Sequence, residues 1–272
     1  MTGRYAVIGN PVAHTLSPRI HAAFAQQTAE DIEYGMILAP IGEFASTVER
    51  FRAEGGHGLN VTVPFKLDAF AFATRLTERA QSAGAVNTLK FENDAVLGDN
   101  TDGAGLVADI ARLGISIVGK RILLMGAGGA ARGVVLPLLD QRPAFVAIAN
   151  RTVPKAVALA EQRAGRGPIQ GGSYVDFSDE RFDVIINATS ASLHGEVPPL
   201  PDRTFATATL AYDMVYGARP TAFLARANAH GVPHVADGLG MLIEQAAESF
   251  YVWRGVRPPR TASIIAMLRE GR

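Results

Sequence analysis

The chain has 272 residues, a length that fits one large domain or two modest ones. Its 26 basic and 26 acidic side chains cancel, so no bulk basic surface favours nucleic acid as a partner. The absence of cysteine excludes disulfides, thiol nucleophiles and cysteine-ligated metals. No stretch approaches the roughly 20 apolar residues of a membrane span, and no signal peptide is evident. We therefore expect a cytoplasmic α/β protein without nucleic-acid or membrane partners, and the composition is compatible with a homodimer as well as a monomer.

Short apolar runs alternate with helical patterns in the first part of the chain. Ser17-Pro18 is typical of an N-cap followed by proline at the first helical position, which predicts a helix to about Thr28. A second helix is expected from Pro64 to about Leu76. Strands are predicted at 5–8, 34–38, 58–63, 87–90 and 95–98. This alternation favours a mostly parallel sheet covered by helices.

The same alternation continues after residue 102. A helix is predicted from 102–103 to Gly114, which would be its C′ residue. Strands follow at 121–125, 145–149, 182–187 and 210–215, and helices at about 128–139 and 153–164. The final helix is expected after Gly238, because Leu239, Leu242, Ile243, Ala246, Ala247 and Phe250 form one apolar stripe.

These patterns predict two α/β domains. The first covers 1–102 and the second 103–237, and the segment 238–272 is expected to pack back on the first. Ligands often bind where domains meet, so a functional cleft is expected between the two.

A glycine-rich turn follows the strand at 121–125. The residues Gly126, Ala127, Gly128, Gly129, Ala130 and Ala131 read G-x-G-x-x-A between a strand and a helix. Gly126 would permit the tight turn, and Gly128 would let the backbone approach a pyrophosphate at the helix N-terminus. The alternative is a turn without a ligand, but its context favours dinucleotide binding.

The next strand ends in Asn150-Arg151-Thr152, with Lys155 close by. An NAD site usually presents a carboxylate at this position to the ribose 2′-hydroxyl. Arg151 could instead pair with a 2′-phosphate. The sequence therefore favours NADP over NAD, the alternative being a solvated arginine.

Polar residues also cluster in the first domain. Lys66 lies in an expected first helical turn, where the helix dipole disfavours a cation, and such a local conflict suggests function. Asp102 could be no more than an N-cap. Thr62, Asn87 and Ser17 could be a strand hydroxyl, a turn amide and a helix cap, and Gln245 could be a solvent-exposed residue. His14, His21 and His57 show no metal-ligand spacing and are expected to be structural or surface residues, so no metal is predicted.

Taken together, the motifs resemble the shikimate dehydrogenase family over nearly the whole chain. The matching segments are 9–11, 14–18, 60–66, 84–88, 100–103, 125–132, 150–152, 187–190, 213–216, 237–242 and 244–246. Such a resemblance implies a substrate domain, a Rossmann-type NADP-binding domain, and the NADPH-dependent reduction of 3-dehydroshikimate to shikimate in chorismate and aromatic amino-acid biosynthesis.

The resemblance also implies roles for individual residues. Lys66 and Asp102 would be the catalytic pair and would also contact the substrate. The other substrate-binding residues would be Thr15, Ser17, Asn60, Thr62, Asn87, Tyr216 and Gln245. The cofactor would be held by Gly126, Ala127, Gly128, Gly129, Ala130, Asn150, Arg151, Thr152, Lys155, Met214 and Gly238.

One position departs from the family pattern. Thr15 stands where the family usually has serine, and the added methyl group would narrow the carboxylate end of the pocket. Quinate, a bulkier relative, is therefore less expected as a substrate. The alternatives are a quinate/shikimate dehydrogenase of broader specificity, a non-catalytic NADP(H)-sensing module, and another two-domain NADP enzyme such as a folate-type dehydrogenase.

Overall fold

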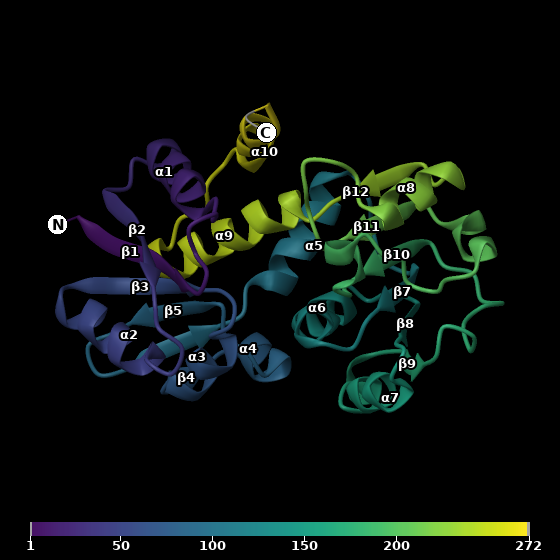
Figure 1. The fold of residues 1–272 in the computed structure, drawn as a ribbon, viewed down its shortest axis with the longest axis horizontal. Coiled ribbons are helices and arrows are strands. Elements are labelled where there is room, and N and C mark those ends of the chain that lie inside the picture. The colour runs from purple at the N-terminus through teal and green to yellow at the C-terminus, as the bar shows by residue number, and fades with distance from the viewer. Residues whose placement is uncertain (1, 271–272) are drawn as a thin grey trace. The chain divides into compact units, whose positions relative to one another are not determined.

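The structure, a computed structural model, describes residues 2–270. The expected α/β class with two domains is confirmed, since the chain forms two compact units (Figure 1). The first unit contains the residues up to Gly105 and those from Leu242 onward, and the second is Leu106–Met241. The chain crosses the boundary inside helix α5 (Asp102–Arg112) and again inside helix α9 (Leu239–Arg254).

The first unit is built on a mixed sheet with the strand order β2-β1-β3-β5-β6-β4. Its first three strands are parallel, but β5 runs antiparallel to both β3 and β6. The expectation of a mostly parallel sheet is confirmed for this half, since β2, β1, β3, β6 and β4 share one direction and β5 is the reversed strand; only four residues join β5 to β6, and so short a connection forms a hairpin. The strands are β1 (Gly3–Gly9), β2 (Ile32–Leu38), β3 (Gly56–Val61), β4 (Arg75–Leu76), β5 (Thr88–Phe91) and β6 (Val96–Asp99).

Three helical predictions for this unit need correction. The helix expected over 64–76 spans only Lys66–Phe72 (α3), because Thr74 is bound to Val96 through both its N–H and its hydroxyl, which draws β4 onto the sheet edge. Leu16, not Ser17, occupies the N-cap position of α1. The helix predicted after Gly238 is α9, but it is not the final helix, because α10 follows it. The helices are α1 (Ser17–Thr28), α2 (Phe44–Ala53), α3, α4 (Glu78–Ala83), α9 and α10 (Thr261–Glu270).

Side chains alternate between the two faces of the central strands, as a pleated sheet requires. Ile8 and Leu59 belong to a core cluster with Phe44 of α2. The neighbouring positions face the other way: Tyr5 stacks on Trp253 of α9, with ring centroids 4.6 Å apart. Asn60 shares this second face, and its amide contacts residues of both α1 and α9. Asn60 is one of the polar residues described below.

The second unit is built on a fully parallel sheet with the strand order β12-β11-β10-β7-β8-β9. Counted from β7, this is the order 3-2-1-4-5-6 of a doubly wound dinucleotide-binding fold, with its switch point between β7 and β10. The strands are β7 (Arg121–Met125), β8 (Phe145–Ala149), β9 (Ile169–Gly172), β10 (Val184–Asn187), β11 (Leu210–Asp213) and β12 (His234–Ala236).

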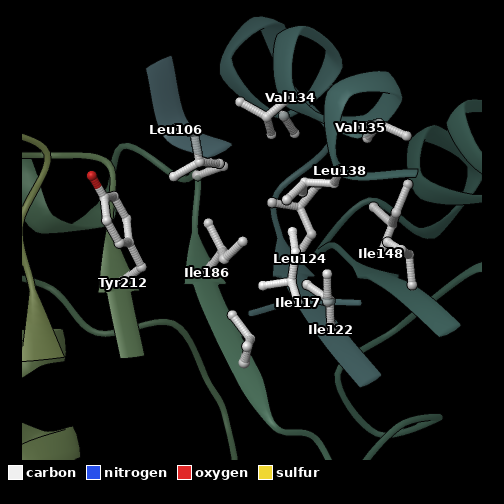
Figure 2. Packing of buried hydrophobic residues seen from close by; sticks show 14 of the residues in the cluster. Leu106, Ile117, Ile122, Leu124, Val134, Val135, Leu138, Ile148, Ile186 and Tyr212 are labelled. Atoms are coloured by element: carbon white, nitrogen blue, oxygen red, sulfur yellow. The ribbon is translucent and has the colours of Figure 1, made fainter. Parts of the chain in front are cut away.

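Buried aliphatic side chains join this sheet to its helices. Figure 2 shows Leu124, Ile148 and Ile186 directed from neighbouring strands toward Val134 and Leu138 of the following helix. The chain segments outside the strands form α5, α6 (Gly129–Asp140), α7 (Val153–Glu161) and α8 (Ala222–Ala229), with short 3₁₀ turns at Ala164–Arg166, Ala191–His194 and Asp202–Thr207. This packing fixes the loop after β7 at the carboxyl end of the sheet.

Candidate active site

Lys66 and Asp102 meet although 36 residues separate them in the sequence. The Lys66 Nζ atom lies 2.6 Å from Asp102 Oδ2. Lys66 begins α3 after strand β3, and Asp102 begins α5 after strand β6. Neither side chain is fully buried, with 34% of the lysine and 18% of the aspartate exposed. An ammonium and a carboxylate therefore face solvent together.

Asn87 holds the second oxygen of this carboxylate. Its Nδ2 donates to Asp102 Oδ1 at 2.8 Å. Its own oxygen accepts the backbone N–H of Thr101 at 2.9 Å. Because a backbone N–H can only donate and a carboxylate can only accept, these two contacts fix which way the amide of Asn87 points.

Gln245 completes this cluster from α9. Its Nε2 donates to the carbonyl of Leu242 at 2.8 Å, so its Oε1 is turned toward Asn87 Nδ2, 3.2 Å away. Gly105 makes the approach possible, since a Cβ there would lie 2.6 Å from the Gln245 backbone nitrogen. The solvent-exposed alternative for Gln245 is wrong, because the side chain is half-buried and bonded on both sides.

Thr15, Ser17 and Asn60 form a second group on the same unit. The Thr15 hydroxyl donates to Ser17 Oγ at 3.1 Å. The Asn60 oxygen accepts from Tyr34 at 2.7 Å and from His21 Nε2 at 3.1 Å. Thr62 stands apart from this network: its methyl group packs against Gly9, where an added Cβ would lie 2.4 Å away.

The groups behind Asn60 are kept uncharged by their surroundings. Burial lowers the pKa of His21 to about 3, partly opposed by its hydrogen bond with Asn60. Burial likewise raises the pKa of Tyr34, partly opposed by a hydrogen bond with Ser17. The imidazole also stacks flat on the Tyr34 ring at 4.1 Å. His21 is thus a structural residue, as the sequence predicts.

In the second unit, the turn after β7 has the geometry that a pyrophosphate needs. Gly126 has φ +108°, and a Cβ there would lie 3.0 Å from the Ala188 carbonyl oxygen, so only glycine fits without strain. Added Cβ atoms at Gly128 and Gly129 would meet nothing within 4 Å. Helix α6 has neither a side-chain cap nor an acidic residue in its first turn, which leaves that end open to an anion. Ala127 is buried and Ala130 exposed within this turn.

The segment after β8 lies at the same edge of the sheet. Asn150 Nδ2 donates to the Thr152 carbonyl at 2.9 Å, which folds the segment into a tight turn. Arg151 and Lys155 are exposed and belong to no described ion pair. Arg151 lies near Tyr174, whose pKa burial raises to about 12 against the opposing effect of the guanidinium. An exposed arginine just after strand β8 suits an adenosine 2′-phosphate.

A third segment of this unit follows β11. Met214 and Gly238 lie side by side, because a Cβ on Gly238 would be 2.2 Å from the Met214 carbonyl oxygen. The buried carboxylate of Asp213 accepts from the hydroxyls of Ser192 and Thr221, at 2.6 and 2.7 Å. Tyr216 comes three residues later and is exposed. It belongs to the second unit, whereas the other predicted substrate-binding residues belong to the first.

Neither a metal centre nor a membrane span is found in the described part of the chain. Among residues 2–270, no group of three or more histidine, aspartate or glutamate side chains could hold a metal ion. No helix within these residues is both long and apolar enough to cross a bilayer.

Comparison with known proteins agrees with this geometry. Residues 7–89 match the shikimate dehydrogenase substrate binding domain, 109–194 the shikimate / quinate 5-dehydrogenase model, and 238–262 the shikimate 5′-dehydrogenase C-terminal domain. The shikimate dehydrogenase (NADP(+)) of Janthinobacterium sp. (strain Marseille) is 58% identical over 99% of this chain and 98% of its own. The chain belongs to the shikimate dehydrogenase family. The relative from Herminiimonas arsenicoxydans, with the same name, is 59% identical over the same shares.

Solved structures show the same fold. An Ael1 enzyme from Pseudomonas putida superposes with a TM-score of 0.94 at 47% identity, and each chain is covered to 98%. The shikimate 5-dehydrogenase of Thermus thermophilus, solved in complex with NADP(H) and shikimate, gives 0.86 at 32% identity over 100% of both chains. The resemblance drawn from the sequence motifs is thereby confirmed.

Sequence reasoning missed several residues that hold the polar clusters together. Thr101, Tyr34 and Ser249 bind the predicted site residues directly, and Asp213 orders the segment before Tyr216. A serine or tyrosine inside an apolar pattern carries no distinctive sequence signal. Only Thr101 and Asp213 lay within the matching motif segments.

Proposed function

We propose that the chain catalyses the reversible, NADP-dependent interconversion of 3-dehydroshikimate and shikimate. The observation that carries the proposal is the Lys66–Asp102 pair, 2.6 Å apart and bordered by the fixed amides of Asn87 and Gln245. A small polyhydroxy carboxylate needs such a set of neutral donors and acceptors beside one proton-transferring group. The 55–59% identity to NADP-dependent shikimate dehydrogenases along the whole chain supports the same activity.

Lys66 is the proton-transfer group in this mechanism. When bound, the nicotinamide supplies a hydride to the carbonyl carbon of 3-dehydroshikimate. The Lys66 ammonium donates its proton to the carbonyl oxygen, which becomes the hydroxyl of shikimate. In the reverse direction the neutral amine takes that proton back. A cation at this point also stabilises the negative charge that develops on the oxygen.

Asp102 orients the lysine and binds a substrate hydroxyl. One carboxylate oxygen is held by Lys66 and the other by Asn87, so the group cannot turn away from the site. Asn87, Gln245, Asn60 and Thr62 bind the remaining hydroxyls, Thr15 and Ser17 bind the carboxylate, and Tyr216 completes the set. The unit up to Gly105 together with residues from Leu242 is accordingly the substrate domain.

The second unit is the NADP-binding domain in this proposal. Gly126, Ala127, Gly128, Gly129 and Ala130 cradle the pyrophosphate at the start of α6. Asn150, Arg151, Thr152 and Lys155 bind the adenosine end, with Arg151 pairing with the 2′-phosphate. Met214 and Gly238 would complete the cofactor site. Cytoplasmic localisation, a homodimer and the absence of nucleic-acid or membrane partners stay predictions.

The deciding experiment follows absorbance at the NADPH band after the protein is mixed with NADP and shikimate. We expect NADPH to form, with a much lower kcat/KM when NAD replaces NADP or quinate replaces shikimate. Comparable values for both acids would favour a quinate/shikimate dehydrogenase of broad specificity. Binding of NADP without turnover of either acid would reject the enzyme in favour of a sensing module.

A further inference from the structure

Behind the proposed substrate site lies a buried hydrogen-bond chain that begins at Asn60. The Asn60 oxygen accepts two hydrogen bonds, from the Tyr34 hydroxyl at 2.7 Å and from His21 Nε2 at 3.1 Å. An amide oxygen has two lone pairs, so both are used by the protein itself. Asn60 therefore cannot accept a hydrogen bond from a ligand.

The nitrogen side of the same amide is only partly used. Asn60 Nδ2 donates to Ser249 Oγ at 3.0 Å, while its contacts with the Asn87 carbonyl and Thr88 Oγ1 are long, at 3.5 and 3.4 Å. Ser249 also donates its own proton to the Gln245 carbonyl at 3.1 Å, so its oxygen receives from Asn60. One amide proton of Asn60 thus lacks a strong protein acceptor.

Tyr34 holds the Asn60 oxygen with the shorter of its two hydrogen bonds, 2.7 against 3.1 Å. Its single proton goes to Asn60, so its own oxygen can only accept. Donation in this pair therefore runs from Tyr34 to Asn60. His21 stacks on the Tyr34 ring and holds it in place.

We propose that Tyr34 is a positioning residue that fixes Asn60 as a pure hydrogen-bond donor toward the substrate. This inference rests on the proposed function and deepens it. The substrate atom that faces Asn60 must be an acceptor, such as a carboxylate or hydroxyl oxygen. Tyr34 does not touch the reacting atoms, so it acts on substrate binding and not on hydride or proton transfer.

The first test is Tyr34→Phe, which removes the hydroxyl but keeps the ring that stacks on His21. We expect the KM for shikimate to rise about tenfold, with kcat and the KM for NADP within about twofold of wild type, the loss that one hydrogen bond to a neutral partner typically gives. Tyr5→Phe is the matched control, since Tyr5 is also a packed aromatic of this unit but stacks on Trp253. An unchanged or lower KM for shikimate in Tyr34→Phe would overturn the inference.

A double-mutant cycle tests whether Tyr34 acts through Asn60. We expect Tyr34→Phe to change the KM for shikimate less than about twofold when Asn60→Ala is already present. A full effect of about tenfold in that background would also overturn the inference. Ser249→Ala, which removes the acceptor on the nitrogen side, should give the same KM-selective loss. Emission of Trp253, the single tryptophan of the chain, checks that each variant is folded.

Assays of the wild-type protein distinguish failure of the proposed function from failure of the role proposed for Tyr34. Absence of turnover by wild type with shikimate and NADP would reject the proposed function itself. Normal wild-type turnover with an unaltered Tyr34→Phe variant would reject only the role of Tyr34.

Discussion

At the scale of single residues, the proposed chemistry depends on the Lys66–Asp102 pair. We expect Lys66→Ala to lower kcat by about 10²-fold or more, because a positioned general acid contributes that much. The affinity for NADP should stay nearly unchanged, since the proposed cofactor residues belong to the other unit. Steady-state kinetics with shikimate, together with NADP titration by fluorescence, measure both quantities. Turnover equal to wild type would remove Lys66 from the mechanism.

His21 links folding stability to pH. Its pKa is about 3 in the folded protein and near 6.5 in an unfolded chain, so between these values the unfolded chain binds the extra proton. The contribution of neutral His21 to the free energy of unfolding is complete above about pH 6.5 and is lost as the pH falls toward about 3. Each pH unit in that window costs up to about 1.4 kcal/mol.

We therefore expect His21→Gln to flatten the dependence of unfolding free energy on pH between about pH 4 and 6. Urea unfolding of both proteins at several pH values measures the difference. The other five histidines are common to both proteins and cancel in the comparison. Parallel curves for wild type and variant would contradict a neutral buried imidazole.

At the scale of elements, two glycines of the turn between β7 and α6 have different expected roles: Gly126 in folding stability and Gly128 in NADP binding. Gly126→Ala should lower Tm by several degrees, because a left-handed backbone costs about 1–2 kcal/mol for other residues and the Ala188 carbonyl is close. Gly128→Ala should leave Tm within about a degree, since its φ is −84° and its Cβ meets no protein atom. Its KM for NADP should nevertheless rise by more than about tenfold, because the added methyl group would occupy the place of the pyrophosphate.

Thermal unfolding and NADP kinetics on the two variants check this contrast. Each variant serves as the control for the other, since both add one methyl group to the same turn. Equal affinity of Gly128→Ala and wild type for NADP would place the pyrophosphate elsewhere.

Individual elements show which parts of the structure could be predicted from sequence patterns. The strand–glycine–helix unit at 121–139 was predictable because the apolar strand, the glycine turn and the start of the helix follow one another directly in the sequence. The helix expected over 64–76 failed because Val96, a residue 22 positions after Thr74, draws the chain onto a sheet edge. The Lys66–Asp102 pair was expected from the family resemblance alone. The bonds from Tyr34 and Ser249 to Asn60 depend on tertiary packing that no local pattern encodes.

At the scale of the whole molecule, an ion-pair network ties the returning C-terminal segment to the first unit. Arg79 of α4 contacts Asp99 of β6 at 2.6 Å and Glu248 of α9 at 2.9 Å. Asp99 is almost completely buried, so loss of its partner leaves an uncompensated charge. Removing one partner of such a pair typically costs about 3–5 kcal/mol.

We expect Arg79→Ala to lower the unfolding free energy of the protein by an amount of this order, reduced because the arginine is a quarter exposed. Arg75→Ala is the matched control, since the exposed pair of Arg75 with Glu92 should contribute less than about 1 kcal/mol. Denaturant unfolding measures both. Equal losses in the two variants would show that burial of Asp99 does not matter.

The return of α9 to the first unit also bears on how the protein is made. Translation completes the segment up to Gly105 early, yet its sheet lacks Gln245, Ser249 and Trp253 until the ribosome has added all of the second unit. The second unit is continuous in sequence and can fold as soon as it emerges. We therefore expect stalled nascent chains in which residues up to 241 have left the ribosome to protect 106–241 from protease while the earlier segment is still cleaved. Equal protection of both segments would show that the first unit matures without its last helices.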